Sequence, residues 1–244
     1  MSFHRIATVM VAGIALLSGC TTSRSGPPAA TTGSTTPASG GTSGCSFEAT
    51  PGDPAPQGKD VGQPTGSEPT TGSVTLRTNQ GEIKIALQGG GAPCTVRNFV
   101  HLALKKYFDN SPCHRLTTTE GLKVLQCGDP TGSGRGGPGY TIPDEKPTDL
   151  KAGKPGPNGQ PTVIYPRGIV AMANTGAPHS GGSQFFIVYG DSTLGADYSV
   201  FGTIDAAGLA ALDKVAAAGV EPKNGPNDGS PTAGVTIQAA VVGA

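Results

Sequence analysis

From residue 73 onward, short apolar runs alternate with glycine-rich loops, and this pattern restricts the fold more than any other feature of the chain. Val74–Thr78 and Ile83–Leu87 repeat apolar residues with a period of two on either side of Asn79-Gln80-Gly81, which predicts a β-hairpin. Further short runs follow at Lys123–Gln126, Ile169–Met172, Phe185–Val188, Val200–Ile204 and Val235–Val242. Runs of this length are typical of strands rather than helices.

Two stretches carry the period of a helix instead. Thr95 can cap a helix from about Val96 to Tyr107, and a second helix is expected near Leu209–Ala218, where Gly219 would end it. The expected inward residues are Val96, Phe99, Val100, Ala103 and Leu104 in the first helix and Leu209, Leu212 and Val215 in the second. Many short strands with two helices predict a mainly β domain over residues 73–244, built as one closed barrel capped by the helices.

The first residues have the features of an export signal. His4 and Arg5 precede an almost uninterrupted apolar run from Ile6 to Leu17, which is shorter than the ~20 residues that a membrane span needs. An ordinary cleaved signal peptide or an uncleaved anchor would fit this run. The order Leu17-Ser18-Gly19-Cys20, however, resembles the lipobox of bacterial lipoproteins. That resemblance implies that residues 1–19 are removed, that Cys20 is diacylated, and that two acyl chains give stable anchoring outside the cytoplasmic membrane.

Residues 20–72 are expected to form a lipidated, disordered tether. Residues 21–44 contain only Thr, Ser, Gly, Pro, Ala and the single Arg24, and residues 48–72 are similarly rich in proline. Such side chains contribute little to a core, so the segment should stay flexible, with a reach on the order of 40 Å. Its Ser, Thr and Pro content is also typical of O-glycosylated segments, which we state as a hypothesis.

Four cysteines remain if Cys20 carries lipid: Cys45, Cys94, Cys113 and Cys127. An even number in an exported chain favours two disulfides, for which three pairings are possible. If Cys113 and Cys127 lay on neighbouring strands with Arg115 opposite Gln126, alternation would point the two thiols to opposite faces, which disfavours their pairing. Cys45 would then pin the end of the tether to the domain.

Metal, cofactor and nucleic-acid partners are not expected. The sequence has no Cys-x-x-Cys spacing, and its histidines have no ligand spacing to the cysteines, so a zinc site is the weaker interpretation. The chain carries 17 basic and 17 acidic residues without a basic stripe, which disfavours electrostatic binding of nucleic acid.

Two distant stretches carry the functional signal. Planar hydrogen-bonding groups stand beside apolar or aromatic residues in His114-Arg115 with Gln126–Asp129 and in Met172–Asn174 with Ser183–Ile187. This mixture suits a groove that holds a hydrophobic ring while polarising an adjacent amide. Alternation makes Phe185 the core residue and Phe186 the groove residue, if Gln184 and Phe186 share a face.

In their order and spacing, these pieces resemble the cyclophilins, the peptidyl-prolyl cis-trans isomerases, throughout residues 73–242. Further matching segments are Ala92–Phe99, Gly134–Gly139, Pro143–Glu145, Gly168–Asn174 and Val200–Gly202. The resemblance implies a closed eight-stranded antiparallel barrel with a helix over each end and a substrate groove on its outer face. Proline-containing polypeptide segments would be the partners.

The resemblance also assigns roles residue by residue. It implies that Arg115 is the catalytic arginine, that Gln126 holds it in place, and that Phe186 is the floor of the proline pocket. The substrate-binding positions that it implies are Ala173 and Asn174 for the peptide backbone, Gln184 in the groove, Leu194 in the pocket wall, and Gly134, Arg135 and Gly136 beside a second pocket.

Three positions depart from the family pattern. Counting back from Gln126, the usual Phe-Met pair falls on Lys123 and Val124, after an insertion whose expected tip is Thr117–Gly121. Thr193 replaces a frequent tryptophan, which predicts weak inhibition by cyclosporin. Tyr198 replaces a pocket histidine, but its ring can still pack on a proline.

We therefore expect a monomeric, lipid-anchored prolyl isomerase that acts on exported or envelope proteins. One alternative is a proline-peptide-binding chaperone module with little turnover. The other is a structural envelope lipoprotein that binds no peptide.

Overall fold

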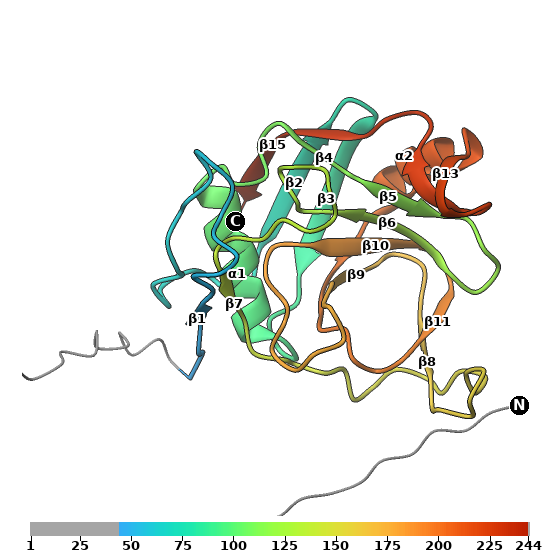
Figure 1. Cartoon of the computed structure of the whole chain (residues 1–244), viewed down its shortest axis with the longest axis horizontal. Helices are drawn as coiled ribbons and strands as arrows, with labels where there is room; N and C mark the ends of the chain where they lie inside the picture. The colour runs from blue at the N-terminus through green and yellow to red at the C-terminus, as the bar shows by residue number, and fades with distance from the viewer. Residues whose placement is uncertain (1–43, 244) are drawn as a thin grey trace, which may run out of the picture. The chain divides into compact units, whose positions relative to one another are not determined.

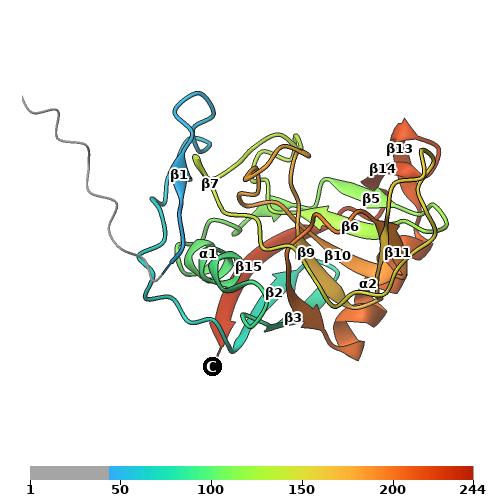
Figure 2. The same cartoon turned by 90° about the horizontal axis from the view of Figure 1, so that it is seen from below.

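The computed structural model describes residues 44–243 (Figures 1 and 2). The predicted signal peptide (1–19), the lipid attachment site Cys20 and residues 20–43 of the predicted tether lie outside the described residues. Within the described part, no helix is long and apolar enough to cross a membrane.

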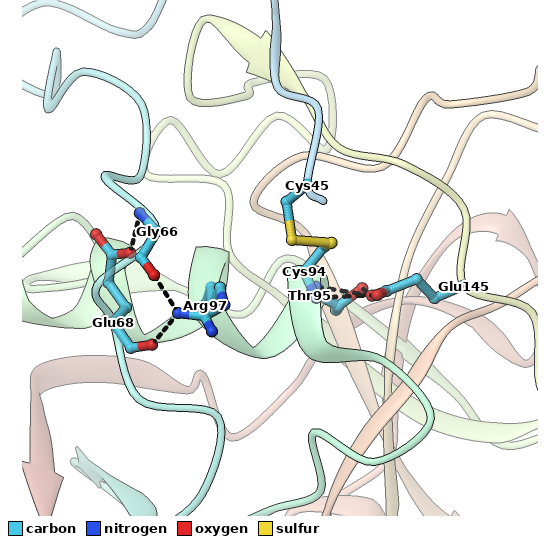
Figure 3. Close-up of a disulfide and its surroundings, with 7 residues drawn as sticks. All are labelled: Cys45, Gly66, Glu68, Cys94, Thr95, Arg97 and Glu145. Atoms are coloured by element: carbon cyan, nitrogen blue, oxygen red, sulfur yellow. Dashed lines mark hydrogen bonds between the residues drawn. A yellow bond between two sulfur atoms is a disulfide. The ribbon is translucent and has the colours of Figure 1, made fainter. Parts of the chain in front are cut away.

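Two helices form close to the predicted positions, α1 (Pro93–Leu104) and α2 (Ala206–Ala217), and each begins three residues earlier than expected. Leu104, which was expected to face inward, is 58% exposed. The predicted Thr95 cap is wrong, because Thr95 lies inside the first turn of α1. The carboxylate of Glu145 instead accepts hydrogen bonds from the backbone nitrogens of Cys94 and Thr95, at 2.9 and 2.8 Å, and so satisfies the free end of α1 from outside the helix (Figure 3). At α2, the side chain of Asp205 accepts from the nitrogen of Gly208, which is a regular N-cap.

The rest of the domain is β structure. The strands at the N-terminal end and in the first half are β1 (Glu48–Ala49), β2 (Ser73–Thr78), β3 (Gly81–Leu87), β4 (Ser111–Pro112), β5 (Arg115–Thr117), β6 (Lys123–Cys127) and β7 (Tyr140–Thr141). The later strands are β8 (Val163–Tyr165), β9 (Ile169–Met172), β10 (Phe185–Gly190), β11 (Ser192–Leu194), β12 (Val200–Ile204), β13 (Val220–Gly225), β14 (Asp228–Pro231) and β15 (Thr236–Gly243).

One antiparallel sheet contains most of these strands and curls on itself. Its order is β13-β14-β5-β6-β10-β9-β12-β3-β2-β15-β4. Strands β4 and β5 stand near opposite ends of this order, yet only Cys113 and His114 separate them in the chain. The two ends must therefore lie close together. The mainly β fold with two helices is confirmed, with one large antiparallel sheet that curls around its core.

The core and the groove occupy opposite faces of the same sheet. The main cluster of buried side chains includes Phe99 from α1, Phe185 from β10 and Phe201 from β12. A second cluster, centred on Val124 and Phe186, lies outside it. As predicted, Phe185 lies in the core and Phe186 on the outer face, because adjacent strand residues point to opposite faces.

Residues 44–72, which we call the N-terminal strap, pack onto the domain. A flexible tether was expected up to residue 72, and the structure differs here. Strand β1 pairs with β7, and Phe47 stacks edge-on against Tyr140 with ring centroids 6.1 Å apart. Figures 1 and 2 show the strap beside α1 and β7.

The strap is fastened to α1 along its length. A disulfide joins Cys45 to Cys94, and the guanidinium of Arg97 donates to the carbonyl oxygens of Gly66 and Glu68 (Figure 3). Lys59 donates to the carbonyl oxygens of Tyr107 and Asp109, at 2.9 and 2.8 Å, beyond the C-terminal end of the helix. A cation at this position complements the helix dipole. Oε1 of the buried Glu68 lies 3.3 Å from Nδ1 of His101 on α1.

The second disulfide joins Cys113 to Cys127, so the prediction against this pairing is wrong. The alternation argument assumed that Cys113 belongs to a strand, but β5 begins only at Arg115. Cys113 lies in the connection from β4, where strand alternation does not apply, and both cysteines are buried in the core. The bond joins the β4 end of the curled sheet to β6, a strand near its other end.

Candidate active site

A straight row of side chains crosses the outer face of the sheet. Arg115 on β5 pairs with Gln126 on β6, Gln126 pairs with Phe186 on β10, and Phe186 pairs with Ala171 on β9. Directly opposed residues of an antiparallel sheet share a face. The sheet register therefore brings together three residues that the sequence predicted as catalytic.

Hydrogen bonds continue this row to the loop at residues 134–139. Nη1 of Arg115 donates to Oε1 of Gln126 at 3.2 Å, and Nε2 of Gln126 donates to Oε1 of Gln184 at 2.9 Å. Nε2 of Gln184 then donates to the carbonyl oxygen of Gly136 at 3.0 Å. Each amide accepts on one side and donates on the other, so the relay sets the orientation of both glutamine side chains.

Asp228 of β14 holds the other side of the guanidinium, and the sequence analysis missed it. Its carboxylate accepts from Nε and Nη2 of Arg115 at 2.8 and 2.7 Å. Arginine carries five N–H donors. The two bonds to Asp228 and the one to Gln126 use three of them, and the two others can reach a substrate. Asp228 stands far along the chain in an Asn-Asp-Gly turn sequence, which indicates a turn and gives no signal for a site.

The pair of charges stabilises both ionised forms. The hydrogen bond from Arg115 lowers the pKa of Asp228 below its usual value. The same bond raises the pKa of the Arg115 guanidinium, against the opposing effect of partial burial. Arg115 is therefore charged at neutral pH, and its guanidinium is held at three nitrogen atoms.

The apolar half of the site lies beside this fork. Val124, Phe186, Leu194 and Tyr198 all belong to the outer cluster, together with Tyr165. The rings of Phe186 and Tyr198 pack edge to face with centroids 5.4 Å apart. Phe186 is only 5% exposed, so its ring is largely covered.

The predicted backbone-binding residues line a cavity next to the row. Ala173, Asn174, Gln126 and Gln184 share this cavity of about 310 Å³ with the loop at residues 134–141. The nitrogen of Ala173 donates to the carbonyl oxygen of Gln184 at 2.9 Å. The side chain of Asn174 donates to the carbonyl oxygen of Asp197 at 2.9 Å, which ties the segment to the loop that carries Tyr198.

Asp129 anchors the loop that receives the relay. Its fully buried carboxylate accepts from Thr131, Ser133 and the backbone nitrogens of Gly134 and Gly136. Burial disfavours its charge, but the hydrogen bonds from Thr131, Gly136 and Ser133 outweigh this and hold the pKa of Asp129 below its usual value. The loop conformation therefore depends on one ionised side chain.

The insertion after Arg115 reaches the wall of the apolar half. β5 and β6 are connected through a bridge between Thr119 and Leu122, so the tip of the insertion is the turn at residues 120–121, within the predicted Thr117–Gly121. The nitrogen of Thr193 on β11 donates to the carbonyl oxygen of Gly121 at 2.8 Å. The insertion thus supports the strand that carries Leu194. Across residues 44–243, no cluster of His, Cys, Asp or Glu side chains could hold a metal ion.

Comparisons with known proteins agree with this geometry. The sequence model described as cyclophilin type peptidyl-prolyl cis-trans isomerase matches residues 73–242. The chain is 52% identical over 171 residues to the "Probable peptidyl-prolyl cis-trans isomerase B" of Mycobacterium tuberculosis, covering 70% of this chain and 54% of that protein. It therefore spans about half the length of this relative.

A shorter relative and a solved structure match over nearly their whole length. The "Peptidyl-prolyl cis-trans isomerase A" of Mycobacterium tuberculosis is 37% identical over 195 residues, covering 73% of this chain and 98% of that protein. A Cryptosporidium parvum cyclophilin type isomerase, solved in the presence of the dipeptide Ala-Pro, is 29% identical with a TM-score of 0.55. It covers 70% of this chain and 99% of the other.

Proposed function

The chain belongs to the cyclophilin-type peptidyl-prolyl cis-trans isomerase family, and from this we propose that it accelerates rotation about Xaa-Pro bonds in exported or envelope proteins. The observation that carries the proposal is the Arg115 guanidinium, fixed by Asp228 and Gln126 beside the Phe186 ring. The Ala-Pro dipeptide present with the Cryptosporidium relative supports proline-containing segments as substrates.

Rotation about an Xaa-Pro bond is slow because the amide loses its resonance, and the peptide barrier is ~18–20 kcal/mol. In the twisted state the proline nitrogen becomes pyramidal and gains a lone pair. A hydrogen bond to that nitrogen is stronger in the transition state than in the planar ground state, so it lowers the barrier. No nucleophile is needed for this reaction.

The geometry suits each of these steps. Arg115 keeps two N–H donors for the substrate and cannot rotate freely, because three of its nitrogen atoms are already bonded. The rings of Phe186 and Tyr198, with Leu194, would hold the proline ring in place. Ala173 and Asn174 would hold the flanking backbone while the carbonyl group turns.

The test is an assay of cis-to-trans rates on a proline tetrapeptide. Arg115→Ala should lower kcat/KM by about 10²-fold, the cost of removing one preorganised donor in a well-studied enzyme site. Arg77→Ala is the matched control, because Arg77 lies on β2 with its side chain 59% exposed and should leave the rate unchanged. Wild type and Arg115→Ala that accelerate equally little would contradict the isomerase proposal.

A second candidate is a proline-peptide-binding module with little turnover. The observation that favours it is the covered floor of the pocket, where Val124 is 3% and Phe186 5% exposed. The rings of Tyr198 and Tyr165 both pack against Phe186, with centroids 5.4 and 6.2 Å from it. In the same assay this candidate predicts peptide binding without acceleration. The weak cyclosporin inhibition that follows from Thr193 stays a prediction, and a potency equal to that of a sensitive cyclophilin would contradict it.

We further propose that the protein is exported and held by lipid on Cys20 outside the cytoplasmic membrane. The Leu17–Cys20 motif supports the anchor, and two disulfides support an oxidising compartment. Palmitate labelling of the full chain should be lost in Cys20→Ser. Labelling that persists in this variant would contradict the anchor and leave the isomerase proposal intact.

A further inference from the structure

We propose that the N-terminal strap is part of the substrate site, where Asp53 selects a basic side chain next to the Xaa-Pro bond. The inference rests on the proposed isomerase function and adds a substrate class to it. The strap lies before residue 73, outside the segment that the family sequence model matches. The selection would therefore come from a part of this chain that the shared domain does not contain.

The strap is aligned with the loop that forms the cavity. Ala49 pairs with Tyr140, and the nitrogen of Thr50 donates to the carbonyl oxygen of Gly139 at 2.9 Å. A Cβ atom at Gly139, whose φ is +84°, would lie 3.0 Å from the backbone nitrogen of Ala55. Glycine is therefore required at position 139, for its conformation and for the close approach of the strap.

Thr50 and Asp53 of the strap line the same cavity as Gln126 and Gln184, the two glutamines of the hydrogen-bond relay. The relay from Arg115 ends on the carbonyl oxygen of Gly136, which is also in the cavity wall. A substrate residue in the cavity would thus lie beside the residue held at Arg115. Because one extended residue spans about 3.3–3.6 Å, the cavity is within reach of side chains a few positions from the proline.

The charges around the cavity set its preference. Asp53 is the only acidic residue in its lining and Arg135 the only basic one. The other lining residues are uncharged, and many of them are glycines. Asp53 and Arg135 stand on different segments of the chain. A lysine or arginine side chain that lies next to the strap is attracted by the Asp53 carboxylate, whereas an acidic side chain at the same place is repelled by it.

The fastenings of the strap keep Asp53 in place. The hydroxyl of Thr50 donates to the carbonyl oxygen of Asp53, and the nitrogen of Asp53 donates back to the carbonyl oxygen of Thr50, both at 2.9 Å. The Cys45–Cys94 disulfide lies only a few residues before this turn. Asp53 is therefore held at the cavity by a short turn that two hydrogen bonds close.

The experiment uses the protein with its strap and a peptide series with Lys, Gln or Glu at each of three positions on either side of an Ala-Pro bond. At one position the order of kcat/KM should be Lys above Gln above Glu. Asp53→Asn should reduce the Lys-to-Glu ratio there by about two- to fivefold, the range of an exposed ion pair. Arg135→Gln should raise the same ratio.

Glu48→Gln is the matched control, because it removes one negative charge from β1 of the same strap without lining this cavity. A ratio that Asp53→Asn leaves unchanged, or that Glu48→Gln changes equally, would overturn the proposal. The Gln peptides test the isomerase function separately. Should they show no acceleration, fluorescence anisotropy of labelled Lys and Glu peptides still gives the binding ratio for wild type and Asp53→Asn.

Discussion

The groove and the N-terminal strap are held in different ways, although they meet at one cavity. In the groove, adjacent strands place Arg115, Gln126 and Phe186 in a row, and a continuous hydrogen-bond relay links the side chains. The strap has little regular structure and is fastened at separate points, through Cys45, Lys59 and Arg97. A change to one residue of the groove should therefore disturb the positions of its neighbours as well. Loss of one contact of the strap should free only the part of the strap next to that contact.

The largest effect should come from the loop that joins the two regions. Asp129→Ala leaves several backbone and hydroxyl donors without their buried acceptor, which should lower the free energy of unfolding by about 3 kcal/mol or more. It should also lower activity, because Gly136 no longer holds the relay. Thermal and urea denaturation measure the loss. Asp149→Ala removes an exposed carboxylate and should change little, and an equal loss in both variants would contradict a special role for Asp129.

Removing the strap disulfide should have the next largest effect. The bond closes a separation of 49 residues, and its loss should cost about 2–4 kcal/mol. In Cys45→Ser/Cys94→Ser, hydrogen exchange should become faster in residues 44–72 and stay slow in β6 and β10, because the groove does not use this fastening. Equal acceleration in both regions would break the distinction between them.

These two regions also differ in how far the sequence predicts them. In the groove, strand alternation separates Phe185 from Phe186 correctly, because the period of a strand is visible in one sequence. The strap was expected to be disordered, because its composition offers little apolar surface. It is held largely by backbone oxygens, those of Val61 and Gly66 among them, and every sequence carries such groups. Composition therefore gives no signal for these contacts.

The missed features of the groove have a similar cause. Asp228 reaches Arg115 across 113 residues of sequence, and only the pairing of β14 with β5 brings them together. The Cys113–Cys127 bond was rejected because Cys113 was assigned to a strand that starts two residues later. Arg115 and both cysteines were singled out from the sequence, whereas their partners depend on where strands begin and which strands pair.

Asp228→Ala should lower kcat/KM by about tenfold, equivalent to about 1.4 kcal/mol, because the guanidinium loses two of its three fixed contacts. As a positioning residue, Asp228 should affect kcat more than KM, and Asp228→Asn should restore part of the rate. Asp213→Ala is a close control, since Asp213 forms the same two-point contact with Arg167 on the surface. A rate that falls equally in both variants would contradict positioning by Asp228.

The smallest effect should appear in acid, where both regions lose a carboxylate contact. Because the pKa of Asp228 is lowered by Arg115, its contribution to stability is present above the unfolded pKa of about 3.9 and is lost as the pH falls towards the folded pKa. The Tm of wild type should therefore fall more than that of Asp228→Asn between pH 5 and pH 3. The difference should be small and should shrink in high salt, because the pair is partly exposed.

In the strap, Glu68 is buried, and hydrogen bonds from Thr65 and Gly66 lower its pKa against desolvation. Glu68→Gln should therefore reduce the fall in Tm between pH 5 and pH 3 more than Asp228→Asn does. If Asp228→Asn keeps the full wild-type fall in Tm, the Arg115–Asp228 contact does not stabilise the folded groove.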